Sequence, residues 1–394
     1  MQYFGIAMPS EKPSALSIGL MSGTSADGVD GVLLEIHDRA RPELHATCSQ
    51  HYSDSTKKKI RKTAKRKIRD ASEAAELDMQ LAGICAGVVN RLIEHSGPAR
   101  IAVVGCHGQT VHHSPNSKPP FSLQIGNAEE LARLTNLPVV SNFRSADIQA
   151  GGQGAPLAPA FHQAVFASPR ENRSVINIGG ISNITCLPAD PVLDVTGFDT
   201  GPGNTLIDNW CRTHFGCAFD KDGEIAKTGE VQLDLLNILL DDKYLKLETP
   251  KSTGLEYFNM KWVKEKLGLW DGYGQCSDAD ILATLTEFTA TSIANALNAL
   301  TPGVSRGFLC GGGAHNPLLV SMLARRTDFG LEPTTTLGID PQWVEAAAFA
   351  WMAYRTVQGL TSTLPSVTGA SRPVIAGTLH APPAASRVCS TAQS

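Results

Sequence analysis

The feature that most constrains the fold is a pattern that occurs twice in the chain. An apolar run, a glycine-containing turn and a second apolar run make up both "ALSIGLMSGTSADGVDGVLLEI" (15–36) and "SVINIGGISNITCL" (174–187). Two apolar runs joined by a short glycine turn predict a β-hairpin. Phosphate loops and dinucleotide fingerprints need a strand, a loop and then a helix, so the first turn is neither. Two halves with the same opening predict a ligand bound between them.

Helices alternate with strands along the rest of the chain, which predicts an α/β architecture. We expect a first domain over 1–143, with 1–15 as a loose extension, and a second domain over 144–379. The late amphipathic helix after "PQW" is expected to pack back on the first domain, and 380–394 to form a disordered tail. The basic stretch "STKKKIRKTAKRKIRD" (55–70) predicts a solvated helix, with an acidic partner as the alternative.

Composition excludes several classes of protein. The 394 residues suggest two domains or one large one. A net charge of -4 argues against nucleic-acid binding, and the chain has no apolar run long enough to span a membrane. The N-terminus does not resemble a signal peptide. Nine cysteines without a C-x-x-C pair indicate free thiols in a reducing cytoplasm and argue against a zinc site.

The first turn, "GTSADGVD", is suited to an anion. The backbone N–H groups of Gly23, Thr24 and Ser25 can point into a concave turn. The turn has no lysine, and Asp27 would hold a phosphate only through Mg²⁺ and water. The turn therefore suits Mg-ATP, although an ordinary tight hairpin would look the same.

Two later loops complete the pattern. In "GFDTGPGN", Asp199 ends a strand and is a candidate general base, whereas Gly201, Gly203 and Asn204 lead into a helix N-terminus that attracts phosphate. The alternative role for Asp199 is that of a turn or cap residue. In "LCGGGAHNP", the glycines let the backbone lie flat against adenine or ribose, and Asn316 is expected to cap the next helix. These glycines are Gly311, Gly312 and Gly313.

Together the three loops resemble the phosphate, second phosphate and adenosine segments of the sugar kinase/Hsp70/actin superfamily. From about Leu16 to Leu379 the chain is similar to the anhydro-N-acetylmuramic acid kinase family. The motifs that carry this resemblance are "GLMSGTSADGVD", "GCHGQTVHH", "SLQIGNAEELA", "NFRSADIQAGGQGAPLAPAFH", "NIGGISNIT", "GFDTGPGN" and "LCGGGAHN".

The resemblance implies a two-domain actin-like ATPase (ribonuclease H-like) α/β fold with a central nucleotide cleft. It also implies that ATP and water convert 1,6-anhydro-N-acetylmuramic acid to N-acetylmuramic acid 6-phosphate in murein recycling. Asp199 would be the base that activates water, and Mg²⁺ would accompany ATP. The implied ATP phosphate segment consists of Gly23, Thr24, Ser25, Ala26, Asp27, Gly28, Val29 and Asp30.

Several polar residues elsewhere are candidates for contact with the sugar. Arg144 could bind the lactyl carboxylate of the implied substrate bidentately, or it could form a structural ion pair with Asp147. Glu345 could reach a sugar hydroxyl, or simply favour the start of its helix. The other candidates are Gly152 and Gln153, in a close-approach loop at the sugar or the hinge, and His107 and Gln109, which would line the cleft or satisfy a buried strand end.

Two alternatives to this function are kept. One is an ordinary sugar kinase in which Asp199 deprotonates a sugar hydroxyl. The other is a sugar-sensing repressor of the same fold, but the stretch before Leu16 has no room for the helix-turn-helix that such proteins add. A homodimer is left open.

Overall fold

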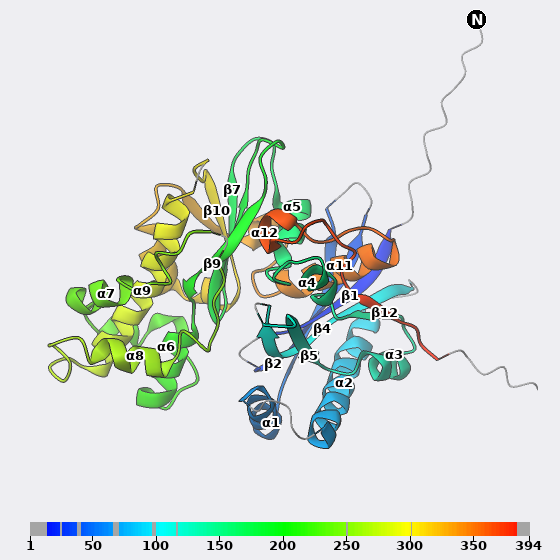
Figure 1. Ribbon diagram of the computed structural model, residues 1–394, viewed down its shortest axis with the longest axis horizontal. Helices are drawn as coiled ribbons and strands as arrows, with labels where there is room; N and C mark the ends of the chain where they lie inside the picture. The colour runs from blue at the N-terminus through cyan, green and yellow to red at the C-terminus, as the bar shows by residue number, and fades with distance from the viewer. Residues whose placement is uncertain are drawn as a thin grey trace, which may run out of the picture.

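Two β-sheets form the core of the computed structural model (Figure 1). The structure describes residues 14–23, 26–37, 41–65, 71–96, 100–115, 117–249, 251–300 and 302–383. The strands are β1 (Ala15–Ser22), β2 (Gly28–Ile36), β3 (Glu43–His51), β4 (Ile101–Ser114), β5 (Phe121–Ile125), β6 (Val139–Ser141), β7 (Arg173–Ile178), β8 (Ile181–Leu187), β9 (Thr196–Pro202), β10 (Arg306–Cys310), β11 (Gly330–Pro333) and β12 (Thr378–His380).

The two sheets share one topology. The first has the order β12-β6-β4-β1-β2-β3, with β5 paired to β4, and the second has the order β11-β10-β7-β8-β9. In each, three consecutive strands form an antiparallel meander, and the next strand lies parallel beside the first strand of that meander. The repeated hairpin in the sequence therefore opens the same unit twice. This duplication is the two-domain actin-like ATPase fold that the sequence resemblance implied.

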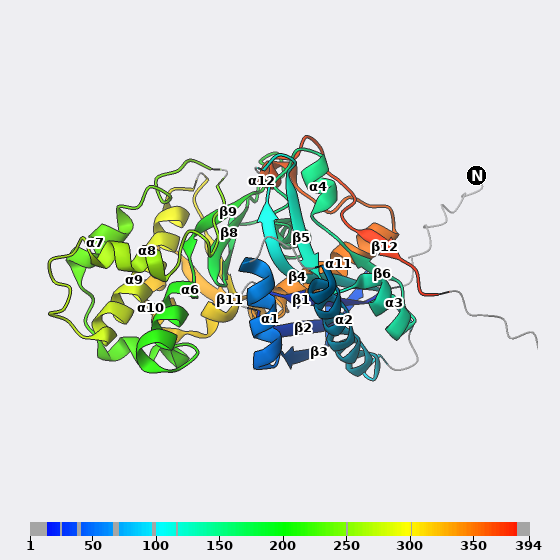
Figure 2. The ribbon, with the colours of Figure 1, turned by 60° about the horizontal axis from the view of Figure 1, so that its bottom comes forward.

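Helices cover both sheets. They are α1 (Asp54–Lys65), α2 (Ala71–Ile93), α3 (Ala128–Thr135), α4 (Ser145–Gln149), α5 (Ala158–Phe166), α6 (Thr205–Trp210), α7 (Leu233–Leu240), α8 (Met260–Leu267), α9 (Asp278–Asn298), α10 (Pro317–Ala324), α11 (Val344–Val357) and α12 (Pro365–Thr368). On α2, buried residues recur at helical spacing, as at Leu77, Leu81 and Cys85, so one face of α2 packs against the first sheet. Figure 2 shows α1 and α2 on that side of the sheet.

The helix α11 lies directly on the opposite face of the first sheet. Gly19 of β1 and Gly105 of β4 are register partners beneath it. A Cβ added to Gly19 would lie 1.9 Å from the carbonyl oxygen of Ala346, and one added to Gly105 would lie 2.1 Å from that of Phe349. Only glycine permits this approach. The same hydrophobic cluster includes α5 and residues of both sheets, so α5 and α11 connect the two halves.

The basic stretch and the ends of the chain can be compared with what the sequence predicted. The predicted helix over this stretch is α1, where Lys58, Lys59 and Arg61 are exposed and Ile60 is buried. His380 ends β12 and pairs with Val139, so the expected tail cannot begin there. Residues 1–13 and 384–394 lie outside the described residues. No helix in the described part of the chain is both long and apolar enough to cross a membrane.

Candidate functional site

Three glycine-containing loops meet at the end of the second sheet where β7, β9 and β10 terminate. The strands β7, β9 and β10 run in the same direction, so their carboxyl ends lie together, which is where open α/β sheets bind ligands. The loop after β9 is tied to the turn after β7 by two backbone bonds, in which Gly203 N–H donates to Gly180 O (2.9 Å) and Asn204 N–H to Gly179 O (2.8 Å). The side chain of Asn204 donates to Ile178 O (3.2 Å). This bond fixes the loop, and Asn204 does not cap α6.

The glycines in these loops let their backbones pack closely and present a surface without side chains. Gly311 has a φ of +77°, a conformation that favours glycine. A Cβ on Gly203 would lie 2.2 Å from the Gly179 oxygen, and one on Gly313 would lie 2.3 Å from a side-chain carbon of Ile178. Gly201 also has a positive φ, of 143°. The structure therefore brings together the expected second phosphate loop and the expected adenosine loop.

The carboxylate of Asp199 is held by a segment that lies far from it in the sequence. Its Oδ2 accepts a hydrogen bond from the backbone N–H of Thr253 at 2.9 Å. The Asp199 N–H donates to Lys251 O (3.1 Å), and the Tyr244 hydroxyl donates to the Asp199 carbonyl oxygen (2.7 Å). The backbone of Asp199 and one carboxylate oxygen are thus fixed by residues 244–253. Sequence reasoning missed these partners, because nothing in their local pattern marks them.

Burial gives this carboxylate an unusual proton affinity. It raises the pKa of Asp199 from 3.8 to about 7, although the hydrogen bond from Thr253 N–H opposes the shift. The carboxylate of Glu256 adds to the increase by repulsion. A general base works best when its pKa lies near the working pH. Asp199 therefore has the proton affinity of a general base, which a turn or cap residue does not need.

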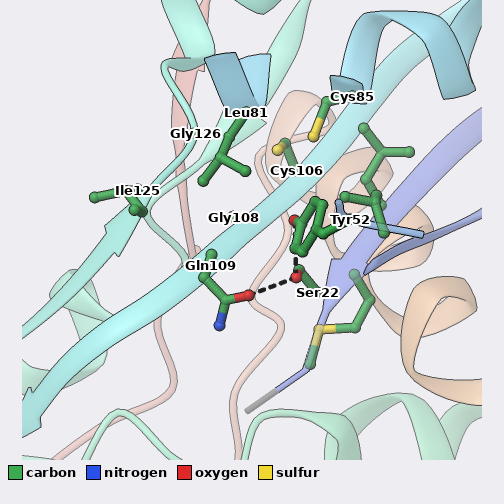
Figure 3. A pocket seen from close by; sticks show the side chains of 12 residues that line it. Ser22, Tyr52, Leu81, Cys85, Cys106, Gly108, Gln109, Ile125 and Gly126 are labelled. Carbon is green, nitrogen blue, oxygen red and sulfur yellow. Dashed lines mark hydrogen bonds between the residues drawn. The ribbon is translucent and has the colours of Figure 1, made fainter. Parts of the chain in front are cut away.

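The turn between β1 and β2 is held from beneath by a chain of hydrogen bonds (Figure 3). The Tyr52 hydroxyl donates to Ser22 Oγ (3.0 Å), and Ser22 Oγ lies 2.7 Å from Gln109 Oε1 and 2.8 Å from Gly28 O, to either of which it can donate. The Gln109 amide donates to Gly23 O (3.1 Å). This geometry favours Gln109 as a support of the expected phosphate segment over direct contact with the sugar. Sequence reasoning missed Ser22 and Tyr52.

The pocket drawn in Figure 3 lies behind this turn. Ser22, Tyr52 and Gln109 supply its polar groups, and Cys85 and Cys106 line it as free thiols. The other lining residues are Leu20, Met21, Val29, Leu81, Gly108, Ile125 and Gly126. The pocket is part of the packing that supports the turn.

Few side chains of the turn itself can reach a ligand. Val29 and Ala26 are buried, and a Cβ on Gly28 would lie 2.5 Å from Gln50 O. Asp30 accepts hydrogen bonds from Ser49 and from Gln342. Thr24 and Ser25 lie outside the described residues. Within the described part of the turn, Asp27 is the side chain that is free to face a ligand, since it is more than half exposed.

Two charged residues that sequence reasoning missed lie near Asp27. Lys57 of α1 places its Nζ 3.6 Å from Asp27 Oδ1. Asp208 of α6 approaches Asp27 from the other half of the molecule. Burial raises the pKa of Asp208 to about 7, the nearby Arg212 opposes the shift, and the charge of Asp27 adds to it. No local pattern joins these positions, which only the assembled fold brings together.

Arg144, which is half-buried, pairs with the buried His107 near the carboxyl ends of the strands of the first sheet. Arg144 Nη2 donates to His107 Nε2 at 2.8 Å, and Nη1 donates to Gly154 O at 2.7 Å. Burial and the charge of Arg144 hold the pKa of His107 well below its usual range, so the imidazole is neutral and its Nδ1–H donates to Gly108 O. Arg144 Nε has no hydrogen-bond partner in the described part of the chain.

Asp147, the expected alternative partner of Arg144, is hydrogen-bonded to other groups. Asp147 is fully buried, and its carboxylate accepts bonds from Gly154 N–H (2.8 Å) and the Thr368 hydroxyl (2.7 Å). Both Glu345 and Asp147 favour the charged Arg144, whereas burial lowers its pKa to about 10. Burial raises the pKa of Glu345. Arg144 therefore remains a cation at neutral pH, with donor capacity left for a ligand.

The loop before α5 reaches toward the segment that holds Asp199. Gln153 N–H donates to Thr368 O (2.8 Å), and its side chain lies 3.4 Å from the Ser252 hydroxyl. A Cβ on Gly152 would lie 2.2 Å from Asp147 Oδ2, so this position requires glycine. The expected capping role of Asn316 is confirmed, since its side chain accepts from Leu319 N–H at 3.1 Å.

Comparison with known proteins gives one consistent result. The family model described as anhydro-N-acetylmuramic acid kinase matches residues 15–382. A protein of that name from Shewanella halifaxensis is 43% identical over 366 residues, covering 92% of this chain and 98% of the relative. One from Xanthomonas axonopodis is 42% identical over 373 residues, covering 93% and 98%. Among solved structures, an activator of 2-hydroxyisocaproyl-CoA dehydratase from Clostridium difficile, with bound ADPNP, has a TM-score of 0.45, 14% identity and coverage of 87% and 96%.

The half-buried carboxylate of Asp199 predicts a stability that depends on pH. Its pKa is higher in the folded chain than in the unfolded chain, so between about pH 4 and pH 7 the folded chain binds more protons, and stability falls as pH rises. Asp199→Asn stays neutral at every pH. At pH 8 the variant should be more stable by on the order of 2–4 kcal/mol, and the gain should vanish near pH 4. Denaturant unfolding across this range measures it.

The matched control is Asp194→Asn, at an exposed position just before β9. It should show no such dependence on pH. If Asp199→Asn is less stable than the wild type at pH 8, the claim that burial of the charged carboxylate destabilises the fold is wrong.

Proposed function

The chain belongs to the anhydro-N-acetylmuramic acid kinase family, and we propose that it opens 1,6-anhydro-N-acetylmuramic acid with water and phosphorylates O6 with ATP. The product is N-acetylmuramic acid 6-phosphate, in the recycling of murein. The family resemblance stated from the sequence is thereby confirmed. The observation that best supports the chemistry is the half-buried Asp199, whose pKa lies near 7 beside a set of glycine loops.

In the proposed reaction, Asp199 takes one proton from a water molecule as the water oxygen forms a bond to C1 of the sugar. The C1–O6 bond breaks, and its electron pair stays on O6. O6 then attacks the γ-phosphorus, the bond to the β–γ bridging oxygen breaks, and ADP leaves. The Thr253 N–H holds one Asp199 oxygen, which leaves the other for the water. Since phosphoryl transfer depends mainly on positioning and electrostatics, fixed groups of this kind suffice.

We assign the nucleotide to the loops from both halves. The glycines 311–313 would lie against the adenosine, whereas Gly201, Gly203 and Asn204 would contact phosphate. The turn 23–30 would hold the terminal phosphates through its backbone, supported by Gln109. The exposed backbone and close packing of these loops support this assignment. A cytoplasmic location is proposed on the same basis, since the reaction consumes ATP.

The carboxylates of Asp27 and Asp208 fit the needs of Mg²⁺. Their mutual repulsion helps to raise the pKa of Asp208, and a divalent cation with oxygen ligands would relieve it. When bound, Mg²⁺ neutralises charge on the phosphates. Asp27 would hold the ion through water, as the sequence suggested. Asp208 would bind the same ion from the other half of the molecule.

Sugar recognition is proposed for the pair of Arg144 and Glu345. The substrate carries a lactyl carboxylate, and Arg144 keeps a positive charge and an unpartnered Nε. Glu345, which interacts with Arg144 at the start of α11, would accept from a sugar hydroxyl. Gln153 would connect the bound sugar to the segment that holds Asp199 through Ser252.

Release of ADP with two sugars tests the proposed function. The anhydro sugar should be turned over, whereas N-acetylmuramic acid should not replace it, since no bond to O6 is then broken. Asp199→Asn should lose about 10²–10⁴-fold in rate while still binding ATP. Equal or faster turnover of the hydrated sugar would instead favour the ordinary sugar kinase.

Chelation tests the proposed metal. Excess EDTA should abolish ADP release, and added Mg²⁺ should restore it, because Asp27 and Asp208 would otherwise repel the phosphates. Full activity in excess EDTA would refute the need for a divalent cation.

Lys57 offers the cation that the turn itself lacks. It lies beside Asp27 and is less exposed than the neighbouring Lys58 and Lys59. Lys57→Ala should raise the KM for MgATP about 10-fold, equivalent to about 1.4 kcal/mol, and should leave the KM for the sugar unchanged. Lys58→Ala, one residue further along the same helix, is the control. Equal shifts in the two variants would mean that only general charge matters.

Arg144 is expected to act on the sugar rather than on the nucleotide. Arg144→Ala should raise the KM for the anhydro sugar more than the KM for ATP, because a carboxylate partner is lost. Arg144→Lys should recover only part of this loss, since lysine cannot form the bidentate pair. A shift in the KM for ATP of equal or larger size would place Arg144 on the nucleotide.

A further inference from the structure

A second cluster of chemically capable side chains lies at the far end of the first hairpin. The sequence Glu-x-His occurs twice, as Glu35-Ile36-His37 at the end of β2, with His37 just beyond it, and as Glu43-Leu44-His45 at the start of β3. Residues two apart on a strand point to the same face. In both triplets the apolar middle residue packs into the core. Each triplet therefore places a carboxylate and an imidazole together on the outer face.

The pairing of the strands brings the two triplets into contact. Glu35 and Glu43 are register partners, and like charges directly opposite are destabilising unless something positive lies between them. Leu34 pairs with Leu44 and Leu33 with Ala46, so His45 stands at a bulge. Bulges redirect side chains, and here His45 Nε2 lies 2.7 Å from Glu35 Oε2.

The donor atoms of three of these side chains converge, and His37 lies beside them. One atom each from Glu35, Glu43 and His45 lies within 4.8 Å of the other two. His37 Nε2 lies 4.0 Å from Glu43 Oε1, is shielded from solvent, and has no hydrogen-bond partner among the described residues. Hydrogen bonds from Ser14 and His45 lower the pKa of Glu35, which keeps this carboxylate charged. A shielded imidazole nitrogen that lies near the Glu43 carboxylate without hydrogen bonding to it is not explained by packing.

We propose that Glu35, His37, Glu43 and His45 bind one Zn²⁺ ion or a similar first-row metal. Imidazole and carboxylate donors in a set of four suit tetrahedral zinc. Glu43 is 71% exposed and free to adjust to the ion, and Ser14 holds the second oxygen of Glu35, as outer partners of metal ligands do. The ion would relieve the Glu35–Glu43 repulsion and fasten the edge strand β3 to β2.

This metal site is separate from the candidate catalytic site. Gly28, at the start of β2, adjoins the proposed phosphate turn, and Ile36 ends the strand eight residues later. At about 3.3 Å per residue the two lie about 26 Å apart. The proposal does not depend on the proposed kinase activity. It also uses no cysteine, which is why cysteine spacing gave no sign of it.

Titration calorimetry of the untagged, metal-free full chain with Zn²⁺ tests the proposal. Wild type should bind one ion, and His45→Gln and Glu43→Gln should each weaken binding at least 10-fold. Glu43 is exposed, so its variant should fold normally. His95→Gln, at an exposed position in the turn just after α2, is the matched control and should bind as wild type does.

Co²⁺ in place of Zn²⁺ identifies the ligands. The expected visible spectrum is that of a site with nitrogen and oxygen donors, without the charge-transfer band of a thiolate. Three results would each overturn the proposal: no binding of a single ion, binding unchanged in both His45→Gln and Glu43→Gln, or a thiolate band that places the metal on cysteine.

Discussion

The proposed chemistry depends on the burial of one carboxylate, that of Asp199. Asp199 is withdrawn from water, yet a backbone N–H from Thr253 and a hydroxyl from Tyr244 hold its position. Burial raises its pKa to about 7, and the hydrogen bond from Thr253 N–H limits the increase. A carboxylate in this state destabilises the fold at high pH and has the pKa that the proposed base near pH 7 needs, a trade-off found where activity depends on a strained group.

The duplicated sheet explains why the other groups lie around this carboxylate. In each half, parallel strands end at one edge, and the loops after them point the same way. The second half supplies a flat glycine surface around Asn204. The first half supplies the turn that Gln109 supports and, separately, the side chain of Arg144. The helix α11 can lie across the first sheet because Gly19 and Gly105 lack side chains, and it brings Glu345 close to Arg144.

The sequence predicted those features that local patterns encode. The paired hairpins, the alternating helices, the Asn316 cap and the fold class all follow from periodicity, glycine turns and long motifs, and the structure agrees with them. Lys57, Asp208 and Thr253 were missed because their importance depends on contacts between segments that are distant in the chain. Gln109 was noticed, but its partner Ser22 could not be, since a register between β1 and β4 is not visible in one sequence. Tyr52, which donates to Ser22, was missed for the same kind of reason. The sequence left open whether Arg144 pairs with Asp147 or binds a ligand carboxylate. The hydrogen bonds that Asp147 makes to other groups, which bear on this choice, are visible only in the fold.

The central claim is that water attacks the sugar while the freed O6 attacks phosphorus. Turnover of the anhydro sugar in ¹⁸O-water, followed by mass spectrometry of the product, tests this most directly. The account predicts one ¹⁸O at C1 and none in the phosphate, with both reactions lost together in Asp199→Asn. Label in the phosphate, or a variant that opens the ring without phosphorylating it, would contradict the account.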